Sequence, residues 1–122
     1  MCGIIGSTNL NTEFAFSSAL RYLEKRGPDS VGEWSNENIH LGHTRLAIRD
    51  ISNNGAQPMQ TVDGRYVLVY NGELYNYLEI KSLLENHKIT FSGSSDTELI
   101  CHLFSIYGTL AISMLEGMFA IA

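Results

Sequence analysis

The pattern of apolar positions and turn residues in the first half of the chain predicts a strand, a helix and two further strands. We expect them at residues 2–8 (strand), 13–25 (helix), 32–34 and 39–46 (strands). The first strand is short and rich in Ile and Gly, which is typical of a buried strand. The helix carries Phe16, Leu20 and Leu23 on one stripe, and Gly27-Pro28 ends it.

The second half predicts one more strand, two helices and a final strand. We expect a loop at 50–60, a strand at 65–70, helices starting at 76 and 95, a short turn at 109–115 and a buried strand at 117–122. Each helix opens on a polar side chain with Glu three residues later, Asn76 with Glu79 and Ser95 with Glu98, the pattern of a capping box. Because the edges of the final strand need partners, we expect a piece of a longer domain that can self-associate through an exposed sheet edge.

Composition and charge exclude several classes of protein. A chain of 122 residues with 44% apolar and 17% charged residues suits one globular domain. A net charge of −5 without a basic run argues against nucleic acid or an anionic membrane as a partner. No apolar run approaches the roughly 20 residues of a bilayer span, and the N-terminus lacks the basic start of a signal peptide. We therefore expect a cytoplasmic location.

Cys2 has the most distinctive chemistry in the chain. Removal of Met1 would leave a thiol and a free α-amine on the same residue. An α-amine has a pKa of about 7.7–8.0, so it can accept the thiol proton near neutral pH. One residue then supplies both nucleophile and base, which is the chemistry of an N-terminal nucleophile. The alternative is an incidental small residue, and Cys2 by itself does not decide between the two.

Six short motifs in register favour the catalytic interpretation of Cys2. In chain order they are Cys2-Gly3-Ile4-Ile5-Gly6, Arg26-Gly27-Pro28-Asp29-Ser30, Gly42-His43-Thr44-Arg45-Leu46, Asn71-Gly72-Glu73-Leu74-Tyr75-Asn76, Ser94-Ser95-Asp96-Thr97-Glu98 and Gly117-Met118-Phe119-Ala120. Together they resemble the class II (N-terminal nucleophile) glutamine amidotransferase domain, in particular the N-terminal glutaminase domain of glutamine-hydrolysing asparagine synthetases. The resemblance covers nearly the whole chain.

The resemblance implies catalytic roles for three residues. Cys2 would attack the side-chain amide carbon of glutamine and form a glutamyl thioester with release of ammonia. Asn71 and Gly72 would form the oxyanion hole, one donor being the Asn71 side-chain amide and the other the Gly72 backbone N–H. An Asn-Gly pair alone would indicate a hairpin turn, but a helix expected from residue 76 leaves no second hairpin strand directly after it.

The resemblance also implies a grip on the amino-acid end of glutamine. Arg45 would hold the α-carboxylate, for which a planar guanidinium with paired donors is suited. Asp96 would bind the α-ammonium, although an Asp in the first helical turn also complements the helix dipole. Glu73 would face the ammonium or order the segment that carries Asn71 and Gly72.

Other reactive side chains are not assigned to the site. Cys101 falls inside an apolar helix and is expected to be a core thiol. The four histidines lack the spacing of a metal site, so no metal is expected. Among them, His43 either orders Arg45 or packs as an ordinary strand histidine. The loop at 26–29 is expected to shape the backbone near the pocket, because its Gly and Pro specify conformation.

The implied architecture is α+β: an αββα sandwich of two antiparallel sheets between helices, truncated at its C-terminal end. Residues 1–122 would be an incomplete type 2 amidotransferase domain that supplies ammonia to a synthetase domain in a longer chain. Within the family, relatives that make amino sugars or nucleotide precursors usually carry Trp or Tyr after the arginine. Here the runs at 45–50, 26–30 and 57–59 resemble the asparagine synthetase branch instead. No cofactor is expected in this chain, because ATP and Mg²⁺ belong to the synthetase domain. The alternatives are an inactive fragment or interaction module, and the glutaminase half of another class II amidotransferase.

Overall fold

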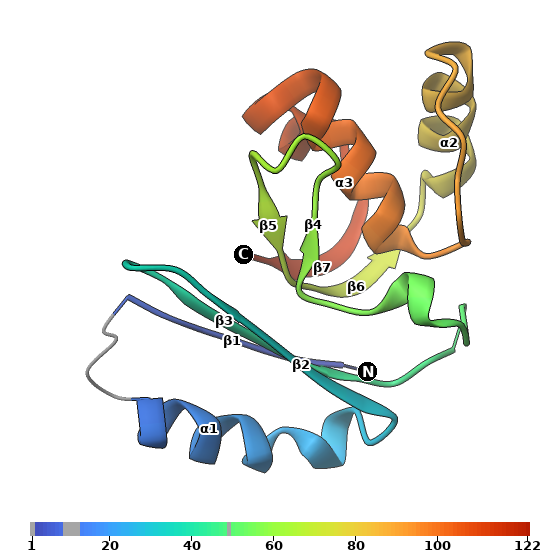
Figure 1. Ribbon diagram of the computed structural model, residues 1–122. Coiled ribbons are helices and arrows are strands. Elements are labelled where there is room, and N and C mark those ends of the chain that lie inside the picture. Colours follow the sequence, from blue (N-terminus) through green and yellow to red (C-terminus); the bar gives the residue numbers. More distant parts are fainter. Residues whose placement is uncertain (1, 9–12, 49) are drawn as a thin grey trace.

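The computed structural model describes residues 2–8, 13–48 and 50–122, and it stacks four layers (Figure 1). Helix α1 lies beneath the sheet β1–β3–β2, the sheet β6–β7 lies above it, and α2 and α3 form the far side with the β4–β5 hairpin beside α3. This order confirms the expected α+β arrangement of antiparallel sheets between helices. The strands are β1 (Gly3–Ser7), β2 (Ser30–Ser35), β3 (His40–Arg45), β4 (Met59–Gln60), β5 (Val67–Leu68), β6 (Tyr70–Leu74) and β7 (Gly117–Ile121). The helices are α1 (Glu13–Tyr22), α2 (Tyr77–Asn86) and α3 (Asp96–Tyr107), with short 3₁₀ helices η2 (Glu24–Arg26), η3 (Asn53–Gly55) and η4 (Gly108–Met114).

The central strand β3 of the first sheet sends alternate side chains to its two faces. On one face Gly42 packs directly against α1, and the Thr44 hydroxyl donates to the Leu23 carbonyl at 2.9 Å. The alternate residues His43 and Arg45 are therefore turned toward the other sheet, β6–β7. Both are buried there, although both are polar.

The strand predicted at 65–70 is wrong in its extent. Only the two-residue strand β5 falls within that range, and a separate strand, β6, begins at Tyr70. The chain changes partner at this point, because β5 pairs with β4 whereas β6 pairs with β7. At the change, the N–H of Val69 donates to the Ala122 carbonyl at 2.8 Å and the N–H of Ala122 donates back at 3.0 Å. A change of partner strand is a tertiary event that local β-propensity does not encode.

Asn71 and Gly72 lie inside β6 and do not form a hairpin turn. They pair with Ala120 and Phe119 of the antiparallel strand β7. Alternation along β6 buries its first and last residues in the core with α3, and it turns Asn71 and Glu73 to the opposite face of the sheet.

The cap of α3 differs in part from the predicted capping box. The Ser95 hydroxyl accepts a hydrogen bond from the Glu98 N–H at 3.2 Å, as a capping residue should. The Glu98 carboxylate does not return to Ser95. It accepts from the N–H groups of Ser92 and Gly93 at 2.6 and 2.8 Å instead, and so fixes the loop that leads into the helix.

Two further predictions near β7 are corrected. Asn76 stands at the N-cap of α2, but its side chain donates to the Met114 carbonyl at 2.9 Å and accepts from the Glu116 N–H at 3.0 Å. The side chain thus ties the start of α2 to the segment before β7 and does not cap the helix. Strand β7 was predicted to be buried, yet Met118 is 70% exposed, because only one face of the β6–β7 sheet packs against the helices.

The run Asp96–Met114, which joins α3 and η4, is longer and more apolar than the sequence pattern suggested. Its 19 residues and mean hydropathy of 1.2 would suffice for a membrane span by length and composition alone. In the structure its apolar side chains contribute to a core shared with α2 and β6, and Gly108, at a φ of 59°, turns the chain from α3 into η4. Core helices meet the same criteria, and α3 packs as one, whereas Leu110 and Ile112 of η4 are exposed.

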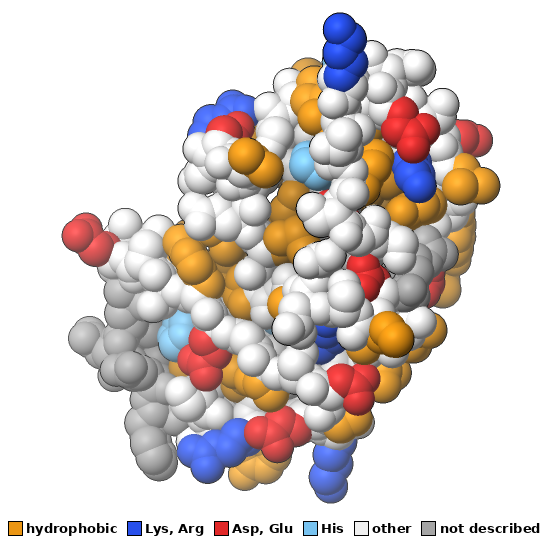
Figure 2. All heavy atoms as spheres, turned by 45° about the vertical axis from the view of Figure 1, so that its right-hand side comes forward, with side chains coloured by type: hydrophobic (Ala, Val, Ile, Leu, Met, Phe, Trp, Pro, Cys, Tyr) orange, Lys and Arg blue, Asp and Glu red, His pale blue; other side chains and the backbone are white. Residues whose placement is uncertain are grey.

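Charged side chains of both signs are interspersed on the face shown in Figure 2. On that face Lys and Arg lie singly and do not gather into a patch. This distribution agrees with the net charge of −5 and gives no electrostatic footprint for a nucleic acid there.

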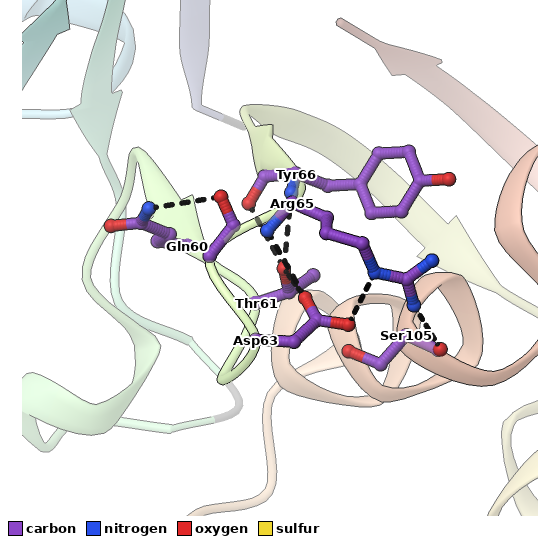
Figure 3. A network of polar contacts seen from close by, with 7 residues as sticks. Gln60, Thr61, Asp63, Arg65, Tyr66 and Ser105 are labelled. Atoms are coloured by element: carbon purple, nitrogen blue, oxygen red, sulfur yellow. Dashed lines mark hydrogen bonds and ion pairs between the residues drawn. The ribbon is translucent and has the colours of Figure 1, made fainter.

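A polar network fixes the β4–β5 hairpin to α3 (Figure 3). The Asp63 carboxylate accepts from the Thr61 hydroxyl at 2.7 Å, and from the backbone N–H and Nε of Arg65 at 3.1 and 2.7 Å. The Arg65 guanidinium also donates to the Ser105 carbonyl of α3 at 2.6 Å. These hydrogen bonds lower the pKa of Asp63 to about 2, and the bond from the Thr61 hydroxyl has the largest effect.

We predict that Asp63→Asn lowers the melting temperature at pH 7 by a few degrees, and that this difference shrinks as the pH falls from 5 to 3. The pKa of Asp63 lies below its ordinary value of 3.8, so the ionised carboxylate stabilises the fold above that pH and this contribution is lost as the pH falls toward about 2. Thermal unfolding at several pH values measures the effect. Glu37→Gln, at an exposed position in the β2–β3 turn, is the control and should show no such trend. A difference for Asp63→Asn that stays constant with pH would contradict the prediction.

Candidate active site

The six residues that the resemblance assigns to catalysis or substrate binding line one pocket between the two sheets. They are Cys2, Arg45, Asn71, Gly72, Glu73 and Asp96. The start of β1, the end of β3, strand β6 and the start of α3 converge there, on the right-hand side of Figure 1. The cavity has a volume of about 130 Å³. Sites for drug-sized ligands are typically about 300–1,000 Å³, so the pocket suits a ligand the size of an amino acid.

Cys2 is partly buried at the start of β1, with its thiol against the residue that follows Arg45. The Leu46 N–H donates to Cys2 Sγ at 3.3 Å, and Sγ lies 3.8 Å from the Leu46 carbonyl oxygen. These contacts hold the sulfur beside the residue that follows β3. The main chain of Cys2 is also held, because Arg26 Nε donates to its carbonyl at 3.2 Å.

Arg45 is held in place by main-chain carbonyls. The side chain is buried, and its guanidinium donates to the Ser52 carbonyl at 2.7 Å and to the Asp50 carbonyl. Gly55 packs against the same guanidinium, and a side chain at position 55 would displace it. A guanidinium carries five N–H donors, so these two bonds fix its position and leave donors for a ligand.

Asp50 clips the loop after β3 to the loop before α3. Its carboxylate accepts from the hydroxyl and N–H of Ser52 at 2.6 and 2.8 Å, and from the Ser94 N–H at 2.8 Å. The Ser52 hydroxyl contributes most to lowering the pKa of Asp50, followed by the Ser94 N–H. The same loop supplies the two carbonyls that hold Arg45, so Asp50 supports the guanidinium indirectly.

The hydrogen-bond alternation of β6 decides which of its N–H groups face the pocket. Val69 and Ala122 exchange both backbone bonds, so the next such pairs in the antiparallel ladder are those of Asn71 and Glu73. The N–H groups of the residues between them, Gly72 included, point to the edge away from β7. The Gly72 N–H is therefore directed at the edge that the pocket occupies, as an oxyanion donor requires.

Asp96 is fixed at this same edge of β6. Its carboxylate accepts from the Leu74 N–H at 3.0 Å, and it is buried in the first turn of α3. The bond places an anionic group two residues along the strand from Gly72. Glu73 lines the pocket from the face of β6 that points away from α3, and it is exposed to solvent.

His43 forms a buried contact between the two sheets. It is 1% exposed, and its ring hydrogen-bonds the backbone of Tyr70 in β6. Burial, followed by the nearby Arg45 charge, lowers the pKa of His43 to about 4, although the bond to Tyr70 acts in the opposite direction. The ring is therefore neutral at physiological pH. Of the two roles expected for it, inter-sheet packing is the one that its contacts support.

Cys101 and the other histidines lie outside the pocket. Cys101 is buried in α3, and burial, with a smaller effect of Glu98, raises its pKa to about 12. This confirms a core thiol. Within residues 2–8, 13–48 and 50–122, no group of three or more His, Cys, Asp or Glu side chains could hold a metal ion.

The loop at 26–29 shapes the pocket, as expected, and Gln57 contributes to the pocket without having been assigned a role from the sequence. Besides the bond from Arg26 to Cys2, the Asp29 carboxylate accepts from the Ala47 N–H at 2.7 Å, so the loop supports two walls of the pocket. Gln57 lies in the pocket wall, but the sequence places it only in a long loop and in the run Gln57-Pro58-Met59, which resembles the asparagine synthetase branch without implying a role in the site. Neither contribution can be derived from spacing, because both depend on how the loops fold back.

Three comparisons bear on this site. The chain matches the family model described as a glutamine amidotransferase domain over residues 1–122. It is 37% identical to glutamine-hydrolyzing asparagine synthetase 1 of Bacillus subtilis (strain 168) over 98% of this chain and 20% of that one, and 39% identical to glutamine-hydrolyzing asparagine synthetase 2 of Oryza sativa subsp. japonica over 98% and 21%. Among solved structures, glutamine phosphoribosylpyrophosphate amidotransferase from B. subtilis, complexed with ADP and GMP, matches with a TM-score of 0.58 and 30% identity, over 69% of this chain and 20% of that one. The chain thus spans about a fifth of the length of the curated relatives it matches.

We predict that His43 makes the fold sensitive to mild acid. Its pKa in the folded protein, about 4, lies below the ordinary 6.5, so the unfolded chain binds a proton between these values and the folded protein does not. Below pH 6.5 the free energy of unfolding should fall by up to about 1.4 kcal/mol per pH unit through this residue. Denaturant titrations between pH 7.5 and 5 measure the slope.

In His43→Gln this part of the pH slope should vanish. The matched control is His87→Gln, at an exposed position where the ring contacts the Tyr107 hydroxyl, and it should keep the wild-type slope. Equal slopes in His43→Gln and wild type would show that another group carries the acid sensitivity.

Proposed function

The chain belongs to the glutamine amidotransferase domain family, and we propose that it hydrolyses the side-chain amide of glutamine to glutamate and ammonia. One observation carries this proposal. A thiol at Cys2, two donors at Asn71 and Gly72, and two opposite charges at Arg45 and Asp96 line a single pocket of amino-acid size.

In the proposed reaction Cys2 is the nucleophile. After removal of Met1, its α-amine takes the thiol proton, and the thiolate attacks the amide carbon of glutamine. The carbonyl electron pair moves to oxygen and forms a tetrahedral intermediate. The α-ammonium of Cys2 then protonates the leaving nitrogen, and the return of the electron pair expels ammonia. Water then cleaves the glutamyl thioester and regenerates the thiol.

Asn71 and Gly72 stabilise the charge on the tetrahedral intermediate in this proposal. The direction of the Gly72 N–H follows from the alternation of β6, and the Asn71 side chain projects from the pocket-lining face of the same strand. Donors fixed on a strand need little reorganisation as charge develops, which is why such groups are effective.

Arg45 and Asp96 hold the two ends of the amino-acid group. The Arg45 guanidinium binds the α-carboxylate through donors that the loop carbonyls leave available, and Asp96 binds the α-ammonium. Glu73, on the pocket-lining face of β6, adds a second negative charge toward that ammonium. The opposite charges of Arg45 and Asp96 give glutamine one preferred orientation, with its side-chain amide toward Cys2.

We propose that the released ammonia is used by another domain of a longer protein. The curated relatives are named as glutamine-hydrolyzing asparagine synthetases and are about five times longer than the matched region. We infer that a synthetase-type domain in a longer, cytoplasmic protein uses the ammonia, and that any ATP and Mg²⁺ bind to that domain. Leu46 after Arg45 favours this branch over that of the phosphoribosylpyrophosphate amidotransferase. Glutamate release from glutamine by a Met1-free sample separates this function from that of a non-catalytic module.

We predict that 6-diazo-5-oxo-L-norleucine, an electrophilic glutamine mimic, labels Cys2 and spares Cys101. Cys2 shares its pocket with groups that bind an amino acid, whereas Cys101 is buried and its pKa is raised to about 12. Peptide mapping by mass spectrometry, on folded protein shown to lack Met1, locates the adduct. An adduct on Cys101, or on neither thiol, would contradict the assignment of the nucleophile.

We predict that Arg45→Lys and Asn71→Ala give different kinetic defects. Arg45→Lys should raise KM for glutamine roughly tenfold or more, because a point charge replaces paired donors. Asn71→Ala should lower kcat by about 10²–10³-fold with a smaller change in KM, since its contact strengthens as the oxyanion forms. Steady-state glutamate production measures both constants. The same pattern in the two variants would mean that the division of roles is wrong.

A further inference from the structure

Gln57 makes two hydrogen bonds that connect separate walls of the pocket. Its side-chain oxygen accepts from the Tyr70 N–H at 2.6 Å, and its side-chain nitrogen donates to the Thr97 hydroxyl at 2.8 Å. Tyr70 directly precedes the proposed oxyanion pair in β6, and Thr97 directly follows Asp96 in α3. One amide group thus reaches the neighbours of both the oxyanion donors and the ammonium-binding carboxylate.

The backbone of Gln57 is seated on the first sheet. Gly32 of β2 lies directly beneath it, and a side chain at position 32 would overlap the Gln57 carbonyl. The backbone of Gln57 is therefore anchored on the sheet β1–β3–β2, while its side chain binds the sheet β6–β7 and α3. This seat distinguishes Gln57 from a surface glutamine, whose side chain is free to change rotamer.

The edge of β6 shows what this arrangement achieves. Three consecutive outward N–H groups lie along it, at Tyr70, Gly72 and Leu74. Gln57 accepts from the first and Asp96 from the third. Both flanking donors therefore have a side-chain partner, and Gly72, between them, is the donor presented to a ligand.

We propose that Gln57 is a positioning residue that sets the Gly72 donor and Asp96 at a fixed separation, an inference that rests on the proposed glutaminase function. Its contact with Tyr70 fixes the start of the oxyanion strand, and its contact with Thr97 fixes the turn that carries Asp96. Loss of the amide leaves the bond from the Leu74 N–H to Asp96 to hold this edge of β6 to α3, so the Tyr70 end of the strand can shift relative to the turn of α3. The oxyanion contact and the ammonium contact then weaken together. A displacement of about 1 Å is enough to cost about 100-fold in rate.

Four variants of the full-length gene product test this role. Gln57→Met keeps the length of the side chain and removes both hydrogen bonds, so kcat should fall about 10- to 100-fold and KM for glutamine should rise. Gln57→Glu still accepts from the Tyr70 N–H and can accept from the Thr97 hydroxyl, so kcat should recover to within about threefold of wild type. Thr97→Val removes only the contact with α3 and should raise KM with little change in kcat. Gln60→Met is the matched control with wild-type kinetics, because Gln60 bonds the Gly64 carbonyl in the exposed β4–β5 hairpin.

A second readout does not depend on activity. Amide hydrogen exchange of the peptide that contains the Tyr70 N–H should be faster in Gln57→Met and protected again in Gln57→Glu. Wild-type kcat and KM in Gln57→Met would overturn the inference, as would a fall in kcat that Gln57→Glu does not restore. If wild-type protein released no glutamate from glutamine and left Cys2 unlabelled, the proposed function itself would fail. That outcome differs from an active wild type whose Gln57→Met variant is unaffected.

Discussion

The hydrogen-bond alternation of β6 is the constraint on which the site depends. An antiparallel ladder satisfies every second residue of a strand and leaves the others pointing outward. At the edge away from β7, an outward N–H without a partner would be costly if buried and a template for pairing if exposed. Here the donors of Tyr70 and Leu74 bond to Gln57 and Asp96, so the edge is closed except at Gly72. A strand edge that would otherwise pair with another chain is thus converted into a single directed donor.

The first sheet contributes the proposed nucleophile and a buried cation. Cys2 and Arg45 come from the adjacent strands β1 and β3, and the pairing of Gly3 with Thr44 brings them side by side. His43, two residues before Arg45, contacts the backbone of Tyr70, so a neutral polar contact joins β3 to β6 across the two sheets. A charged histidine there would repel Arg45 and require solvation inside the sheet interface. The burial of His43 between β3 and β6 therefore accounts both for its low pKa and for the polar contact between these two strands.

The sequence was sufficient to predict most of the elements and six residues that the structure brings into one pocket, but it missed β4 and the contacts that hold the pocket together. The helical stripe at Phe16 and Leu20 and the cap at Ser95 are local patterns, and the structure confirms them. The break between β5 and β6 was missed because it arises from a change of partner strand, and nothing in the run of β-branched and aromatic residues marks it. Glu98 and Asn76 have capping spacing, yet both bond elsewhere. Glu98 accepts from N–H groups in the loop just before its helix, and Asn76 bonds the segment before β7, which is distant in sequence.

The loop after β3 explains why a buried arginine is tolerated without a carboxylate bonded to it. Burial of a charge is costly unless hydrogen bonds replace its hydration. Among the described residues the hydrogen bonds of the Arg45 guanidinium go to the main-chain carbonyls of Ser52 and Asp50, which replace water but carry only partial charge. The Asp50 carboxylate bonds the N–H groups of Ser52 and Ser94 and not the guanidinium, and the charge of Arg45 has only a small effect on it. The positive charge is therefore positioned but only partly compensated, and an anionic group that enters the pocket gains more from it than water does. An α-carboxylate meets that requirement, and its binding would complete an arrangement that the fold has already oriented.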